Sequence, residues 1–164
     1  MANPRRRRII KISEQAAEVA QALGLPGDFD LDFNPFAEGV DGTKALAVEK
    51  ISQQIMTAIN SFAAAAEGAG VNETGAFEAA LNSVVDVVKV KAGKLNDAGV
   101  STADKTIDFT KASDLNLIKV KIADEAEKII AEGGAHGPNG FTKSAITNLI
   151  DDTAAAIKNV NDQI

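Results

Sequence analysis

Apolar residues recur at intervals of three and four positions over most of the chain, which is the spacing of one face of an α-helix. The clearest run predicts a long helix that begins at Asp41 or Thr43, either of which is a suitable N-cap, and continues to about Glu67. The predicted buried stripe of this helix is Val48, Ile51, Ile55, Ile59, Phe62 and Ala66.

Four further segments show the same spacing, and they cover about residues 10–23, 72–92, 113–132 and 142–164. Asn72 or Thr74 would begin the second of these helices, and Ser113 would cap the third. Glycine-rich turns separate them. Their predicted inward-facing residues are Ile12, Ala16, Val19 and Leu23, then Phe77, Leu81, Val84 and Val88, then Leu115, Ile118, Ile122, Ala126 and Ile129, and finally Ile146, Leu149, Thr153, Ile157, Val160 and Ile164. The pattern therefore predicts an all-α protein, an elongated bundle of about five helices.

Composition agrees with this fold class and indicates how the helices meet. Of the 164 residues, 45% are hydrophobic but only 4% are aromatic, and alanine supplies much of the remainder. The segments "SFAAAAEGAG" and "DDTAAAIKN" are typical of helix faces that approach each other closely. We expect one helical domain over residues 10–164, preceded by a basic arm over residues 1–9, with residues 93–113 as a connector.

An extended, phenylalanine-rich connector follows the first helix, and its sequence is "GLPGDFDLDFNPFAEGVDG", residues 24–42. Its acidic residues alternate with apolar ones. One interpretation is an irregular calcium site, because carboxylate and amide oxygens are the ligands that calcium prefers. The ligands would be Asp28, Asp30, Asp32, Asn34 and Glu38. The spacing argues against a true EF-hand, because Pro35 occupies the sixth loop position, where the turn needs a left-handed residue.

The second interpretation of this connector is structural. An extended segment with its large apolar side chains turned inward would close one end of the bundle and leave the aspartates in water. The side chains concerned are Phe29, Leu31, Phe33 and Phe36. Asn34 would then cap a short helical turn that begins at Pro35. We favour this interpretation, and the calcium site stays as the alternative.

Charge is distributed unevenly. The net charge is −6, yet all the arginines lie together at Arg5, Arg6, Arg7 and Arg8. Without them, 13 lysines face 23 acidic residues, a net charge of −10, so we do not expect the body to bind nucleic acid. The arginine arm is either a site for an anionic partner or a solvated terminus. No run of about 18 apolar residues predicts a membrane span, and no apolar segment behind the arginines predicts a signal peptide.

Candidate chemistry is sparse. The chain has no cysteine, which excludes a disulfide framework, a thiolate nucleophile and cysteine-ligated metals. His136 is the only histidine, and it lies in the glycine-rich segment "GGAHGPNG". The sequence also lacks the common nucleophile, zinc-protease and phosphate-loop motifs. We therefore expect no enzymatic activity and no cofactor other than calcium.

Two stretches of the chain resemble a known kind of module. "ALGLPGDFDLDFNPFAE" followed by "KALAVEKISQQIMTAINSFAAAAEGAG" is similar to alanine-rich helical modules of very large secreted bacterial proteins that carry calcium-binding repeats, of the hemolysin-type or cadherin-like adhesin sort. The similarity covers residues 20–70, and the ending "TAAAIKNVNDQI" extends it to residues 150–164. The matching residues are Gly24, Leu25, Pro26, Asp30, Leu31, Asn34 and Pro35, then Ala47, Val48, Lys50, Ile51 and Ile55.

The chain departs from that pattern at Asn34, where aspartate is usual, in its arginine arm, and in lacking Gly-Asp-rich repeats. The resemblance implies a spacer or interaction module of an extracellular or cell-surface protein, in which the repeats rather than the helical module hold calcium. The sequence thus favours a non-enzymatic structural or interaction module that contacts other domains or protein partners through helical faces. One alternative is the calcium-binding module. The other is a self-assembling protein in which the arginine arm of one chain meets the acidic body of the next.

Overall fold

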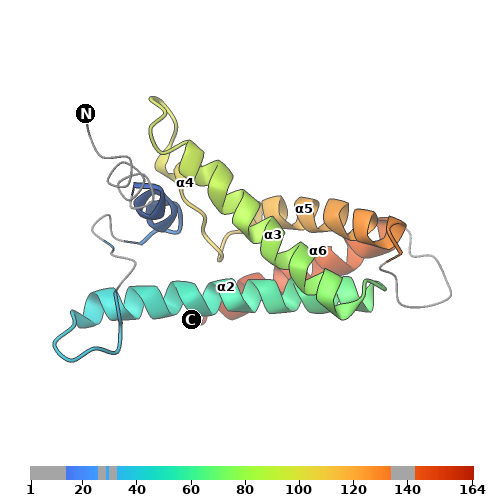
Figure 1. Cartoon of the computed structure of the whole chain (residues 1–164), viewed down its shortest axis with the longest axis horizontal. Helices are drawn as coiled ribbons and strands as arrows, with labels where there is room; N and C mark the ends of the chain where they lie inside the picture. Colours follow the sequence, from blue (N-terminus) through green and yellow to red (C-terminus); the bar gives the residue numbers. More distant parts are fainter. Residues whose placement is uncertain (1–13, 26–28, 30–32, 134–142) are drawn as a thin grey trace, which may run out of the picture. The chain divides into compact units, whose positions relative to one another are not determined.

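Helices make up most of the part of the chain that the structure describes. The computed structural model describes residues 14–25, 29, 33–133 and 143–164, with backbone only at residues 143–146 and 149. Residues 14–22 form the first described helix. It is followed by α2 (Gly42–Gly68), α3 (Glu73–Gly93), α4 (Thr102–Lys105), α5 (Ala112–Ala131) and α6 (Lys143–Asn161), with no strand in these residues (Figure 1). The all-α prediction is confirmed.

The helices divide between two compact units, one within Met1–Ile51 and Val88–Ile107 and the other within Ser52–Val87 and Asp108–Ile164. Helices α2 and α3 contribute residues to both. Because residues 1–13 lie outside the described residues, the proposed arm over residues 1–9 and single domain over 10–164 stay predictions. None of the described helices combines the length and the apolar character needed to cross a membrane.

Two hydrogen bonds to backbone carbonyl oxygens connect the short elements of the first unit. Ala20 and Ala22 of the first helix are buried, and the Ala22 carbonyl oxygen accepts a hydrogen bond from the Ile107 N–H at 2.8 Å. The buried Lys91 reaches the Ala103 carbonyl oxygen of α4 at 2.9 Å through its Nζ. The single turn of α4 is thereby tied to the end of α3, in a region where the sequence predicted only a connector.

Side-chain caps begin the two long helices, and a glycine turn joins them. Asp41 Oδ1 accepts the Thr43 N–H at 2.8 Å, and Asn72 Oδ1 accepts the Gly75 N–H at 2.8 Å, so Asp41 caps α2 and Asn72 caps α3. Gly70 adopts a φ of 97°, and the Val71 N–H reaches the Ala66 carbonyl oxygen at 3.0 Å, which is a Schellman ending for α2. The turn between α2 and α3 is therefore short and well defined.

The second unit contains the larger core. Its fully buried large side chains are Phe62, Val71, Phe109, Leu115, Ile118, Ile122, Ile150 and Ile157. Helices α5 and α6 pack against each other, and the predicted α5 stripe is confirmed by the burial of Leu115, Ile118, Ile122 and Ala126. On α2, the stripe is fully buried only toward its C-terminal end, at Ile59, Phe62 and Ala66.

Helix α3 buries Val84 and Val88, as predicted, but leaves the two larger residues predicted before them exposed. Its buried residues in the second unit are small or medium-sized: Gly75, Ala76, Ala79, Ala80, Ser83, Val84 and Val87. Phe77 and Leu81, which we predicted to face inward, are 42% and 37% exposed. The prediction was wrong there because it assumed that the largest apolar residues mark the core. Small residues let the axes of neighbouring helices approach closely, and the large residues then face outward.

On α6, Ile157 is buried as predicted, but the other buried residues lie one position later than predicted. Ile150, Ala154, Ile157 and Asn161 are buried, whereas Val160, predicted to be inward, is 49% exposed. The buried Asn161 explains the shift, because its Nδ2 donates a hydrogen bond to the Phe109 carbonyl oxygen at 3.0 Å. A polar residue at the end of the buried stripe is invisible to a pattern of apolar positions.

The segment before α5 is more ordered by side chains than the sequence suggested. Phe109 is fully buried, and the buried Asp114 accepts the Asp108 N–H at 2.9 Å through Oδ2. Helix α5 begins after Lys111 rather than at the predicted cap Ser113, and Lys111 makes no side-chain cap. The carboxylate of Asp114, in the first turn, takes part in this helix start instead.

We expect the turn around Asp108 to weaken in acid. Partial burial works to raise the pKa of Asp108, but hydrogen bonds from the Thr110 hydroxyl and N–H, with the hydrogen bond and charge of Lys111, hold that pKa below its ordinary value. A carboxyl whose pKa is lower in the folded state stabilises the fold above its unfolded pKa, about 3.9, and this stability is lost as the pH falls through the folded pKa.

The measurement is urea unfolding as a function of pH for the wild type and for Asp108→Asn. The wild type should lose more stability than the variant as the pH drops below about 4. Parallel pH profiles for the two proteins would show that Asp108 carries no such linkage.

Candidate functional site

An exposed apolar stripe runs along the outer face of α3. Phe77, Leu81 and Val85 follow one another at intervals of four residues, so they lie on one face of the helix. All three are more than a third exposed. Single exposed apolar residues are ordinary on protein surfaces, but consecutive ones on one helix face mark a binding surface more often.

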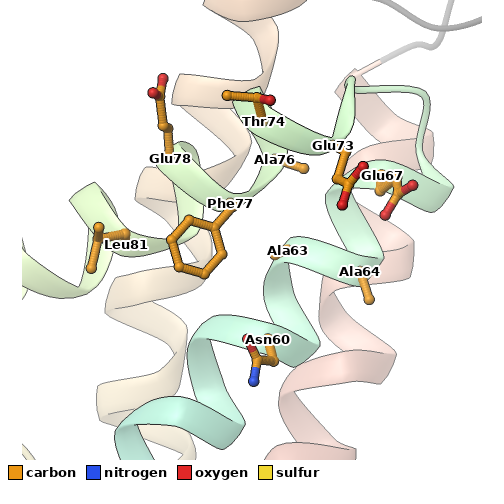
Figure 2. Close-up of a pocket in the computed structure, with 10 residues that line it drawn as sticks. All are labelled: Asn60, Ala63, Ala64, Glu67, Glu73, Thr74, Ala76, Phe77, Glu78 and Leu81. Atoms are coloured by element: carbon orange, nitrogen blue, oxygen red, sulfur yellow. The ribbon is translucent and has the colours of Figure 1, made fainter.

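This stripe opens onto a groove between α2 and α3. The groove encloses about 720 Å³, and Phe77 and Leu81 line it together with Ala63, Ala64 and Ala76. Figure 2 shows Phe77 directed into the space between the two helices, across from α2. Met56, 49% exposed, precedes the lining residue Asn60 by one turn on the same face of α2 and extends the apolar surface.

The rim of this groove is acidic. Its polar lining residues are Asn60, Glu67, Glu73, Thr74 and Glu78, so the lining includes three glutamates and no lysine or arginine. Glu67 and Glu73 lie near the turn that joins α2 to α3 (Figure 2). A second, shallower pocket shares Thr74 and Glu78 with the groove and adds Glu132 at the end of α5. The negative surface therefore continues beyond the groove.

The groove exists because α3 approaches α5 closely on its opposite face. A Cβ placed on Gly75 would lie 2.9 Å from Cγ2 of Ile129 in α5. Together with the neighbouring buried Ala76, Ala79 and Ala80, this contact uses the small face of α3 for the core. The large face, with Phe77 and Leu81, is left to line the groove with α2.

The groove combines apolar lining residues with an acidic rim. Among the described residues, the Asp108 carboxyl group and the Lys128 amino group have shifted pKa values, and both lie outside the lining of the groove. The pKa of Lys128 is raised because its Nζ donates a hydrogen bond to the Glu125 carboxylate at 2.5 Å on the surface of α5. Each shift has local partners, Thr110 and Lys111 for Asp108 and chiefly Glu125 for Lys128.

The predicted calcium ligands are only partly within the described residues. Asn34 Oδ1 accepts the Phe36 N–H at 3.0 Å, so this oxygen already serves the turn that follows, as predicted. Glu38 is exposed. Asp28, Asp30 and Asp32 lie outside the described residues, and no cluster of metal-ligating side chains occurs within the described part of the chain. The calcium site stays a prediction.

The phenylalanine connector needs one correction. The rings of Phe29 and Phe33 contact each other with their centroids 5.8 Å apart, and both residues are half-buried. Phe36, however, is 83% exposed, so its predicted inward position is wrong. The Asn34 turn accounts for this, because the chain is turning rather than extended at Phe36.

Two other sets of candidate residues lie outside the described residues. These are the arginine arm, Arg5, Arg6, Arg7 and Arg8, and the single histidine, His136. The sequence pattern does not indicate the groove, because it places Phe77 and Leu81 in the core. The signal was present, since the apolar residues of α3 cover two adjacent faces, one of small residues and one of large residues.

Fold and groove together define an all-α protein with an acidic, apolar-floored groove between two consecutive helices. No protein-family model, curated protein or solved structure matches the chain.

Proposed function

We propose that the chain is a non-enzymatic helical interaction module and that the groove between α2 and α3 is its binding surface. The observation that carries this proposal is the outward stripe of Phe77, Leu81 and Val85 beside a groove of about 720 Å³. A partner that covers these side chains removes them from water, which favours binding by about 25 cal/mol for each Å² of apolar area buried.

The shape and chemistry of the groove favour an amphipathic helical segment as its ligand. Such a segment places apolar residues at intervals of three and four into a hydrophobic groove between helices. The glutamates on the rim favour basic residues on the flanks of the bound segment. The resemblance to helical modules of large secreted adhesin-like proteins supports a setting at the cell surface or outside the cell, where the module would contact neighbouring domains or protein partners.

The test uses a fluorescent synthetic peptide that forms an amphipathic helix, with leucines on one face and lysines on its flanks. We expect saturable binding to the full chain by fluorescence anisotropy and loss of that binding in the double variant Phe77→Glu with Leu81→Glu. The same change at Leu117 and Val120, two exposed apolar residues of α5, provides the control and should leave binding intact.

Circular dichroism shows whether both variants keep their helices. If the wild type does not bind the peptide, or if the groove and control variants bind it equally, the groove is not the binding surface.

A further inference from the structure

The groove and the basic arm of this chain carry complementary chemistry. The lining of the groove includes Glu67, Glu73 and Glu78 with no basic residue, and the adjacent pocket adds Glu132. The only arginines of the chain are the four at residues 5–8. Each copy of the chain therefore carries both a strongly basic segment, residues 5–8, and an acidic groove.

The residues that follow the arginines match the apolar part of the groove. The sequence "RRRRIIKI" places Ile9, Ile10 and Ile12 directly after the four positive charges. In the groove, Glu67 and Glu73 lie near the turn between α2 and α3, and Phe77 and Leu81 lie farther along α3, with Glu78 between them in sequence (Figure 2). Charge alone is a weak and salt-screened attraction, so the apolar match makes this segment a better ligand than a purely basic one.

Given that the groove is a binding surface as proposed above, we infer that its occupant is the N-terminal segment of a second copy of this chain, with the arginines at 5–8 against the acidic rim and the isoleucines against Phe77 and Leu81. The contact joins two different surfaces, an arm on one copy and a groove on the next. A contact of this kind closes into a symmetric pair when two copies exchange arms, and otherwise it builds larger rings or open chains.

The experiment is sedimentation velocity of the full chain over a range of protein concentrations at low and at high salt. We expect the mass of the wild type to rise with concentration at low salt and to return to that of the monomer at high salt. Two charge-reversed variants identify the surfaces. One carries Glu in place of Arg5, Arg6, Arg7 and Arg8, and the other carries Glu67→Lys with Glu78→Lys. Glu73 is kept because a carboxylate in the first turn of α3 stabilises the helix.

Each reversed variant alone should stay monomeric, and an equal mixture of the two should assemble again, because each reversed surface then meets its opposite. A control with Asp97→Lys and Asp152→Lys, both exposed and outside the groove, has the same charge as the groove variant and should assemble like the wild type at low salt.

A wild type that stays monomeric at every concentration, as it would if the arm bound the groove of its own chain, overturns the inference. Assembly that survives reversal of the arm also overturns it. Neither result removes the proposed function of the groove, which the peptide measurement decides separately.

Discussion

Replacing Phe109 by alanine should lower the free energy of unfolding by about 3–5 kcal/mol, the usual cost of deleting a buried phenylalanine ring. Phe109 is fully buried, although it lies in a segment between two helices rather than on a helix face. Its carbonyl oxygen is held by Asn161 Nδ2, so the backbone has little freedom to move into the cavity that the missing ring leaves. The measurement is urea unfolding followed by circular dichroism.

The matched control is Phe36→Ala. Phe36 is the same residue type in another connecting segment, but it is 83% exposed, and its replacement should change stability by no more than about 0.5 kcal/mol. If Phe109→Ala does not fold, Phe109→Leu, which keeps more of the volume, should fold with a smaller loss. Equal losses at Phe36 and Phe109 would mean that Phe36 belongs to the core, as the sequence alone suggested.

The contrast between these two phenylalanines shows what local sequence can and cannot determine. Helical periodicity depends on neighbours three and four positions away, so the long helices and their caps at Asp41 and Asn72 are predictable. Whether a residue outside a helix is buried depends on which residues from distant parts of the chain pack against it. Phe109 is buried where Asn161 binds its backbone, 52 positions later, whereas Phe36 follows a local turn made by Asn34.

The groove required a second kind of information. Its glutamates lie on both sides of the turn between α2 and α3, and only the short connection that Gly70 permits brings Glu67 and Glu73 to one rim. The choice of face on α3 depends on interhelical distance. Gly75 and the alanines after it allow an approach that Phe77 and Leu81 would prevent, so the larger residues are left at the surface. A hydrophobic scale ranks these residues in the opposite order.

That explanation predicts opposite effects for two glycine substitutions on the same helix. Gly93, the last residue of α3, has no neighbouring atom within 4 Å of the position that a Cβ would take, and Gly93→Ala should stabilise the protein by about 0.4–1 kcal/mol, because alanine reduces the freedom of the unfolded chain. Gly75→Ala restricts the unfolded chain in the same way, but it places its Cβ 2.9 Å from Ile129 Cγ2. We therefore expect a net loss of stability of about 1–2 kcal/mol.

The source of the loss at Gly75 can be identified with a double-mutant cycle. The Cβ would also approach Asn72 Oδ1 at 3.0 Å, but that atom accepts the Gly75 N–H, so the short distance belongs to the cap itself. The contact with Ile129 is the one that must give way. In an Ile129→Ala background, which removes Cγ2, Gly75→Ala should become neutral or stabilising, like Gly93→Ala.

The measured quantity is the coupling free energy between the two sites from urea unfolding of the four proteins. A coupling near zero would show that α3 and α5 are not held together at Gly75. The outward position of Phe77 and Leu81 would then need another cause, because the close approach of α3 to α5 is what leaves the large face of α3 free to form the groove.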